Sequence, residues 1–516
     1  MALKAGTVAA VGGGGKGGVF DGEACACLVR ELRQSFESGR TRSYEWRKQQ
    51  LRMVLKFLVE KEALIVQALH RDLRKPGFEA CVSEISMLKS SCKLILKKLK
   101  RWMEPQKVFK LACVSITSIP GSAEIISEPL GVVLVISAWN YPFLLAMDPV
   151  LGAIAAGNAV VLKPSEVSPS TSSLLASLVS DYLDNSAIKV VEGAVDETTM
   201  LLEQKWDKIF YTGGTRECLN VLLMVAAGCT RVGRVVMTAA AKHLTPVVLE
   251  LGGKCPLVID SKTDLKVTSK RVAVGKWGSN NGQACVAPDY IITTKSFAPK
   301  LIESLKQTLT SFFGDKPLLS PDLSRIVNTN HFSRLTKLLD DQRAFGKIVH
   351  GGERDEKLLM IAPTILLDVP ADALMMNEEI FGPLLPIITV DKIEDSIDII
   401  KSHPKPLAAY LFSNDKKLEK MFVKQISAGG MIVNDTVLHL TNPSLPFGGV
   451  GDSGIGAYHG KHSFDAFSHK KPVLHRCFIG EVWARYPPYN AMKLKFSSSA
   501  VAGDIFGALL SLVRCR

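Results

Sequence analysis

One stretch of the chain has residue types suited to chemistry: the segment KWGSNNGQACVAP at 276–288, which holds Cys285 among small and amide-bearing residues. Pro288 follows the thiol and limits how the backbone can continue. A structural cysteine usually sits in a periodic apolar run, whereas a nucleophile needs an uncrowded sulfur and donors that favour its thiolate. Cys285 has the second kind of surroundings, so it is a candidate nucleophile. Packed, inert thiols are nevertheless common, and the segment alone does not exclude one.

The elements that position this thiol belong to an ordinary globular protein. The chain has 516 residues, of which 47% are hydrophobic and 22% charged. These values exclude a disordered or fibrous class. The length is too great for a single core and predicts two to four domains of about 150 residues each.

The net charge of +13 raises the question of an anionic partner. The excess is spread along the chain, and its densest cluster, at 93–110, alternates lysines with leucines at helical spacing. We therefore interpret the cluster as a solvated helix face, with a membrane-surface contact as the weaker alternative. No nucleic-acid motif is present, so we expect no nucleic-acid partner.

The cysteines and histidines show no metal-site spacing. Eleven cysteines occur without a Cys-x-x-Cys pair, and ten histidines without a His-Glu-x-x-His arrangement. We predict no metal and no disulfide framework, which favours a reducing compartment. His459 and His462 are interpreted as part of a loop or helix surface.

The N-terminal third contains three different patterns. Residues 1–21 are rich in glycine and are predicted to be a flexible leader without the features of a signal or transit peptide, which favours a cytoplasmic protein. Apolar residues then recur at helical spacing from 25 to 102 and predict several amphipathic helices. Two β-prone runs around Pro120 and Gly121 predict a hairpin at 114–129.

From residue 132 onward, apolar strands alternate with helices. This alternation predicts an α/β fold with a doubly wound, Rossmann-like parallel sheet, whose ligands bind beyond the carboxyl ends of the strands. Asn140, Lys163 and Gly213 lie at such ends. A second α/β series runs from 257 to 449. The predicted strands of the first series are 132–137, 159–163, 189–193 and 208–213, and its predicted helices include 151–156 and 172–182.

Six short segments occur in the order and spacing of one enzyme family. Each alone is a weak signal, but the six together are specific. On these segments the chain resembles the NAD(P)-dependent aldehyde dehydrogenases, and within them the class 3 branch as found in plants, from about Cys27 to Tyr489. The segments are SAWNYPF (137–143), VVLKPSE (160–166), LELGGK (249–254), GQACVAPDY (282–290), EEIFGP (378–383) and PFGGVGDSGIGAYHG (446–460).

The resemblance implies a role for the candidate nucleophile. An aldehyde gives up hydride readily only after a nucleophile has formed a tetrahedral adduct, and Cys285 matches the residue that does this. The Asn140 side-chain amide and the Cys285 backbone N–H match the donors to the adduct's oxyanion. Glu250 matches the general base that assists hydrolysis of the thioester. Glu379 is a second candidate base, and the sequence does not separate the two carboxylates.

The resemblance also implies a dinucleotide site. Glu379 matches a residue that holds the nicotinamide ribose, and Phe381 should pack beside it. Lys163 and Glu166 match residues that reach the adenosine ribose, and Gly213 ends a strand at the cofactor. A carboxylate near the 2′-hydroxyl repels a 2′-phosphate, so we expect NAD, with NADP as the alternative. The expected substrate is an aliphatic aldehyde of medium or long chain, derived from lipid.

The chain departs from the family between its fourth strand and the next helix. Residues 214–228 are an insertion at the place where the cofactor phosphates are expected. The insertion either opens a new helix from Gly213 or bulges outward, which would expose the apolar run LNVLLMVAAG at 219–228. A splicing artefact is a third explanation. We hypothesise that the insertion weakens cofactor binding, so the alternative function is a catalytically impaired binding protein with this fold.

The expected domain organisation follows the family pattern. The NAD-binding domain comprises 22–105 and 130–250, and the catalytic domain 251–461. A bridging element of 106–129 and 462–490 pairs with a second subunit in a homodimer, because its strand edges would otherwise promote aggregation. The remaining C-terminal tail, 491–516, is too short and too interrupted by Asp504 to span a bilayer, which leaves peripheral membrane contact as a minority alternative.

Overall fold

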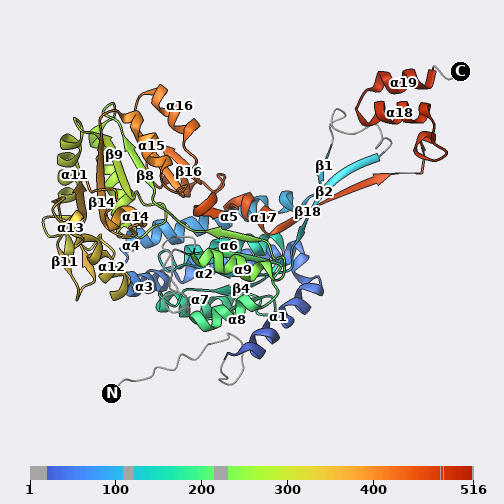
Figure 1. Cartoon of the computed structure of the whole chain (residues 1–516). Helices are drawn as coiled ribbons and strands as arrows, with labels where there is room; N and C mark the ends of the chain where they lie inside the picture. The colour runs from blue at the N-terminus through green and yellow to red at the C-terminus, as the bar shows by residue number, and fades with distance from the viewer. Residues whose placement is uncertain (1–19, 109–120, 214–230, 477, 480, 514–516) are drawn as a thin grey trace. The chain divides into compact units, whose positions relative to one another are not determined.

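The computed structural model describes residues 20–108, 121–213, 231–476, 478–479 and 481–513 (Figure 1). Its contacts divide the chain into two compact units. The larger unit contains the stretches up to Lys98 and from Leu130 to Phe467, and the smaller unit contains Leu99–Pro129 and Ser468–Arg516.

The N-terminal part of the chain is helical, as predicted. The Asp21 side chain caps the first helix by accepting a hydrogen bond from the Ala24 backbone N–H at 2.9 Å. A π-helical stretch, Ala80–Ser86, interrupts the series and matters for the site below. The main helices are α1 (Gly22–Glu37), α2 (Tyr44–Glu60), α3 (Glu62–Leu73) and α5 (Met87–Met103).

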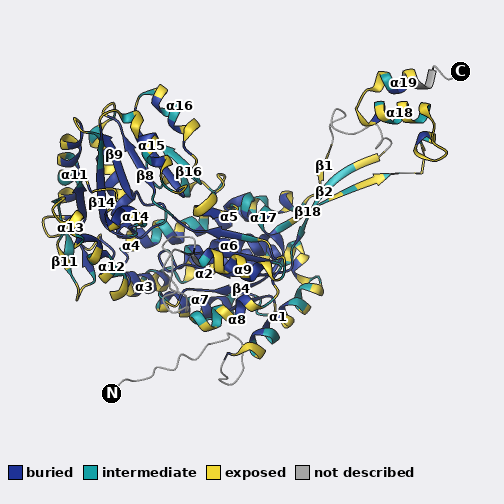
Figure 2. Ribbon diagram, viewed as in Figure 1, coloured by how far each residue is buried: buried dark blue, intermediate teal, exposed yellow. Residues whose placement is uncertain are grey.

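The first sheet of the larger unit has the predicted doubly wound topology. Its described strands lie in the order β17-β7-β6-β3-β4-β5, and all pairs except β17 with β7 are parallel. Every residue of β3, β4 and β6 is buried, because helices cover both faces (Figure 2). The strands are β3 (Val132–Ile136), β4 (Ala159–Lys163), β5 (Ile188–Val190), β6 (Lys208–Thr212), β7 (Val247–Glu250) and β17 (Gly454–Ile455), and the helices α6 (Leu144–Ala156), α7 (Pro169–Tyr182), α8 (Val195–Glu203) and α9 (Arg231–Ala241).

The strand order of this sheet reverses at β3, which pairs with β4 on one side and β6 on the other. Ligands of doubly wound sheets bind in the crevice outside the carboxyl ends at such a reversal. The four strands predicted from the apolar runs are confirmed within a few residues. Asn140 and Gly213 therefore follow the two strands that flank the reversal point.

The second sheet of the larger unit belongs to the later α/β series. Its described strands lie in the order β10-β13-β14-β9-β8-β15-β16, and only the β10–β13 pair is antiparallel. Its strands are β8 (Pro256–Ile259), β9 (Tyr290–Thr294), β10 (Ile348–His350), β13 (Thr364–Leu367), β14 (Leu384–Val390), β15 (Ala408–Phe412) and β16 (Gly430–Val433). Its helices include α10 (Leu265–Lys276), α11 (Ala298–Phe313), α12 (Thr329–Leu339) and α16 (Lys416–Gln425), and α17 (Gly460–Ala466) follows near the end of the unit.

The smaller unit contains an antiparallel sheet and two helices. Its strands, in the order β1-β2-β18, are β1 (Gln106–Lys107), β2 (Gly121–Pro129) and β18 (Ser468–Arg476). β2 coincides with the second half of the predicted hairpin, whereas the first half lies outside the described residues. The helices are α18 (Ala491–Val501) and α19 (Ile505–Val513), and no helix of the described chain is long and apolar enough to cross a membrane.

Candidate active site

The backbone before Cys285 forms an unusually tight turn. After α10 ends at Lys276, a short 3₁₀ turn covers Asn280–Gly282, and its φ angles of 51°, 50° and 80° are all left-handed. A Cβ on Gly282 would lie 2.2 Å from the carbonyl oxygen of Gly382, so the position requires glycine. The small and amide residues noted in the sequence therefore serve a geometric purpose, which is to turn the chain sharply against the EEIFGP segment.

The Cys285 thiol is half-buried and lies among groups that affect its ionisation. The backbone N–H groups of Cys285 and Val286 act as donors toward the sulfur, which favours the thiolate. Burial has the opposite and larger effect, and together with the charges of Glu379 and Glu250 it raises the pKa of the thiol well above its usual range. The thiol is therefore protonated at neutral pH until a base removes its proton.

The structure brings Asn140 to the nucleophile loop. Its side-chain amide donates a hydrogen bond to the Gln283 backbone carbonyl at 3.0 Å, and the residue is 3% exposed. One amide N–H is thereby used to fix the side chain, and the amide retains a second N–H. Asn140 comes from the carboxyl end of β3 in the first sheet, while Gln283 belongs to the second α/β series. The site is thus assembled from both series.

Glu250 is the last residue of β7 and is 2% exposed. Neither of its carboxylate oxygens has a hydrogen-bond partner among the described residues. Burial raises the pKa of this carboxyl well above its usual range. A carboxylate whose pKa is raised by burial is a stronger base than an exposed one, which suits it to accept a proton during a reaction.

The second candidate base, Glu379, lies against the turn that follows β7. A Cβ on Gly252 would be 2.8 Å from Oε2 of Glu379, so the absence of a side chain there lets the carboxylate approach the backbone. The neighbouring residue Ile380 is held by its N–H, which donates to Asp289 at 2.9 Å. Because both Glu379 and Glu250 act on the pKa of Cys285, the structure brings both candidate bases near the thiol.

Two of the residues predicted to hold the dinucleotide, Lys163 and Gly213, lie at the ends of β4 and β6, the strands on either side of β3. Lys163 ends β4 and its ammonium contacts the Glu166 carboxylate at 2.6 Å; the Glu166 side chain remains 34% exposed. The Gly213 N–H donates to the Glu250 carbonyl at 3.1 Å. Phe381 has a left-handed φ of 47°, and its ring packs edge-on against that of Trp139 at 5.5 Å.

Two buried hydroxyls at the ends of β3 and β6 indicate that this edge of the sheet can receive a polar ligand. The side-chain oxygens of Ser137 and Thr212 have no hydrogen-bond partner among the described residues. Buried polar atoms without partners are uncommon and call for an explanation. A dinucleotide at the reversal point fits them, so the residues present are compatible with this cofactor.

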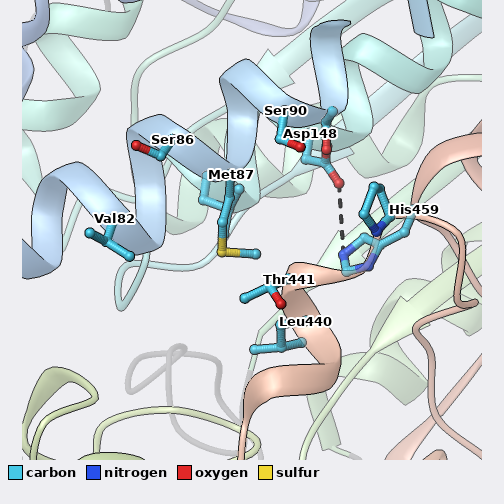
Figure 3. A pocket seen from close by; sticks show the side chains of 11 residues that line it. Val82, Ser86, Met87, Ser90, Asp148, Leu440, Thr441 and His459 are labelled. Carbon is cyan, nitrogen blue, oxygen red and sulfur yellow. Dashed lines mark ion pairs between the residues drawn. The ribbon is translucent and has the colours of Figure 1, made fainter. Parts of the chain in front are cut away.

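A cavity of about 210 Å³ lies beside α6 and the 3₁₀ turn Leu438–Thr441 (Figure 3). Its wall includes Met87, Leu144 and Leu440, together with Asp148 and His459, whose Oδ2 and Nε2 atoms are 3.8 Å apart. The interpretation of His459 as a surface residue was wrong, because the ring is buried and stacks on Phe447 at 5.3 Å.

Burial determines the ionisation of this polar pair. It raises the pKa of Asp148 to about 6 and lowers the pKa of His459 to about 4. Burial, followed by the charges of Glu250, Asp148 and Cys285, raises the pKa of Tyr458, which is next to His459 in the chain. The cavity therefore lies close to the candidate active site.

Sequence reasoning missed several buried polar residues around the site. Lys75, Glu79 and Glu84 contact the backbone of the segments that carry the site, and nothing in the sequence distinguishes them from the other charged residues of the helical block. Lys276 is fully buried, its ammonium has no hydrogen-bond partner among the described residues, and burial lowers its pKa to about 8. Cys255 donates from its thiol to the Cys285 carbonyl at 3.3 Å.

The hypothesis about the insertion concerns residues 214–228, which lie outside the described part of the chain. The described residues resume at Arg231, where α9 begins.

Comparisons with known proteins identify the family of the chain. The model of the aldehyde dehydrogenase family matches residues 21–473. The chain is 60% identical over 488 residues to aldehyde dehydrogenase family 3 member H1 of Arabidopsis thaliana, covering 95% of this chain and 97% of the relative. It is 58% identical over 492 residues to the chloroplastic family 3 member I1 of the same plant, covering 95% and 86% respectively.

A solved structure shares the fold. The substrate-bound state of an aldehyde dehydrogenase from Staphylococcus aureus, AldH, superposes with a TM-score of 0.86 at 39% sequence identity, over 92% of this chain and 98% of that one. The fold, the converging side chains and the plant relatives together show that this chain belongs to the aldehyde dehydrogenase family, in its family 3 branch.

Proposed function

We propose that the protein oxidises aliphatic, lipid-derived aldehydes of medium or long chain to carboxylic acids, with Cys285 as nucleophile and NAD as hydride acceptor. The proposal rests on four groups that lie close together: the Cys285 thiol, the Asn140 amide and the carboxylates of Glu250 and Glu379. The Asn140 amide is fixed on the nucleophile loop, and the carboxylates of Glu250 and Glu379 both act on the Cys285 thiol. A thiol, an oxyanion donor and a general base are the groups that acyl chemistry at an aldehyde requires.

The first step is addition of the thiol to the aldehyde. A carboxylate takes the thiol proton, the sulfur bonds to the carbonyl carbon, and the electron pair of the C=O double bond moves to oxygen. The Asn140 amide and the Cys285 backbone N–H donate hydrogen bonds to this oxyanion. Each such donor, aimed at the oxygen before the reaction begins, contributes about a hundredfold to a thousandfold in rate.

The second step removes a hydride from the carbon that the sulfur now holds. NAD, when bound, supplies the acceptor for this hydride. Glu379 and Phe381 are assigned to hold and orient its nicotinamide ribose, and the chain's remaining task is to keep the thiohemiacetal carbon within reach. Loss of the hydride leaves a thioester on Cys285.

The third step is hydrolysis of the thioester. A carboxylate removes a proton from water, the water oxygen bonds to the acyl carbon, and the carbon–sulfur bond breaks to release the acid and the thiolate. We assign this base role to Glu250, because its oxygens have no partner among the described residues and its pKa is raised. Glu379 is the alternative base.

The preference for NAD over NADP rests on Glu166. Its carboxylate lies at the carboxyl end of β4, where the adenosine ribose is expected, and is partly exposed. A 2′-phosphate would meet this negative charge, whereas a 2′-hydroxyl can donate to it. The neighbouring Lys163 ammonium offsets part of the repulsion, so NADP is the second cofactor to test.

The substrate preference is supported by the cavity beside α6. Apolar side chains such as Met87, Leu144 and Leu440 form much of its wall. Such a wall stabilises an aliphatic chain by removing its surface from water, at about 0.8 kcal/mol per buried methylene group.

The proposal also assigns a function to each part of the chain. Residues 22–105 and 130–250 bind the dinucleotide, and 251–461 carry the nucleophile. The elements at 106–129 and 462–490 bridge two subunits of a homodimer. Edge strands offer backbone groups for pairing with a second copy, and β18 lies at one edge of its described sheet. Contact of the C-terminal helices with a membrane surface is the weaker alternative.

We assign the protein to the cytoplasm. The six cysteines of the described chain are free thiols. The chloroplastic relative makes the plastid the alternative location.

Turnover with hexanal and nonanal tests the reaction. We expect NADH formation that Cys285→Ala lowers by at least about a thousandfold, because the adduct can no longer form. Glu250→Gln should lower turnover while still allowing one acylation per site. Cys27→Ala, a half-buried thiol on α1, is the matched control and should keep full activity. A wild-type protein that folds and binds NAD without turnover would contradict the proposal.

The pH dependence of alkylation tests the environment of the thiol. Because the pKa of Cys285 is raised in the folded protein, its thiolate fraction should still be increasing above pH 9. The rate of inactivation by iodoacetamide, without NAD, should therefore rise through this range. Glu250→Gln should shift the rise to lower pH, because one negative charge near the sulfur is lost. A rate of inactivation that is already constant at pH 8 would contradict this prediction.

The oligomeric state tests the assignment of the bridging element. Light scattering after gel filtration should give about twice the chain mass. Leu474→Lys, on an exposed position of β18, should increase the monomer fraction by placing a charge at the interface. Leu319→Lys changes a similarly exposed leucine of the larger unit and should leave the dimer intact. A monomeric wild-type protein would refute the assignment.

A further inference from the structure

An ion pair with no exposure to solvent lies directly behind Asn140. The ammonium of Lys75 contacts the Glu84 carboxylate at 2.5 Å, and both side chains are 0% exposed. The same ammonium donates to the backbone carbonyl of Asn140 at 3.0 Å and lies 3.9 Å from the centroid of the Tyr141 ring. Lys75 therefore fixes the backbone of the residue whose amide is assigned to the oxyanion.

The partner of Lys75 fixes the next part of the same segment. Glu84 accepts hydrogen bonds from the backbone N–H groups of Phe143 at 2.9 Å and Leu144 at 3.1 Å, at the start of α6. A carboxylate at a helix N-terminus is stabilised by the free N–H groups there. Glu84 is carried by the π-helical stretch Ala80–Ser86, a distortion that is often found at functional sites.

A third buried charge joins this segment to the nucleophile loop. Glu79 accepts from the Asn280 backbone N–H at 2.8 Å and from the Tyr141 hydroxyl at 3.3 Å. The Asn280 side chain in turn donates to the Asn140 carbonyl at 2.9 Å. The backbone after β3 and the turn before Cys285 are thus held by the same group of buried residues.

Stability alone is a poor explanation for such a group. Taking two charges out of water costs about as much free energy as their attraction returns, and apolar replacements of buried ion pairs are often neutral or stabilising. What a buried pair does provide is a fixed geometry, because each of its atoms has a single set of partners. Here the partners belong to the segment of Asn140 or to the turn before Cys285, apart from the Ser324 hydroxyl, which donates to Glu79 at 3.4 Å.

We propose that Lys75, Glu84 and Glu79 are positioning residues that hold the Asn140 amide at the oxyanion position relative to Cys285. The inference rests on the proposed function, in which that amide donates to the oxyanion. None of the three touches the reacting atoms. They act through the Asn140 backbone, and a displacement of about 1 Å there weakens a hydrogen bond that matters most in the transition state.

The test uses the full chain carrying Lys75→Met and Glu84→Gln together, which removes both charges of the ion pair. We expect kcat with hexanal to fall by about tenfold to a hundredfold, with a smaller change in KM. NAD affinity and melting temperature should stay close to those of the wild type. The control is Lys89→Met with Glu62→Gln, a partly exposed ion pair between α5 and α3 that should leave kcat unchanged.

The decisive comparison repeats the Lys75→Met and Glu84→Gln change in an Asn140→Ala background. If the pair acts through the Asn140 amide, it should then lower kcat by no more than about threefold, because the amide is already absent. An equal loss in both backgrounds, or no loss in the wild-type background, would overturn the positioning role while leaving the proposed function intact. Full activity of Asn140→Ala alone would overturn the oxyanion role and with it the positioning role.

Discussion

The hydrogen bond from the Asn140 amide to the Gln283 carbonyl joins the two halves of the active site. Asn140 follows a strand of the first sheet, and Gln283 precedes the nucleophile in the second α/β series. The two residues are 143 positions apart, so neither local propensity nor a short loop holds them together. The tight turn at Asn280–Gly282, the glycine contact with Gly382 and the buried charges behind Asn140 all serve to keep this hydrogen bond in place.

The same burial that gives this precision also controls the chemistry. A dry site strengthens hydrogen bonds to a developing oxyanion, because fewer water dipoles screen them. It also disfavours charge on Cys285 and Glu250, whose pKa values are both raised. The two effects are complementary, since the thiol stays protonated until a neighbouring carboxylate, that of Glu379 or Glu250, takes its proton when the aldehyde arrives. Free, reactive thiolate is not needed in the resting protein.

Much of the fold was predictable from the sequence. In the sequence, the buried strands β3, β4 and β6 are continuous apolar runs, because parallel strands that helices cover on both faces have no solvent-exposed side. The candidate nucleophile was recognisable because its neighbours were too small and too polar for a core. The predicted strand ends placed Asn140, Lys163 and Gly213 beyond or at the carboxyl ends of three strands, which is where they lie in the structure.

The residues that the sequence did not reveal depend on contacts between distant segments. Lys75 and Glu84 are ordinary charged residues in a helical block, and only the folded chain shows that they are buried behind Asn140. His459 looked like a surface histidine for the same reason, since its burial depends on packing against Phe447. Residues 214–228 and the first half of the predicted hairpin lie outside the described residues, so these two predictions remain predictions.

In the proposed reaction the aldehyde becomes covalently attached to Cys285. The most direct measurement is mass spectrometry of the Glu250→Gln protein, quenched with acid shortly after mixing with NAD and nonanal, because this variant should accumulate the acylated form. We expect one acyl group per chain, on the peptide that contains Cys285. NADH formation without an acylated chain, or an acyl group on Cys255 instead, would contradict it.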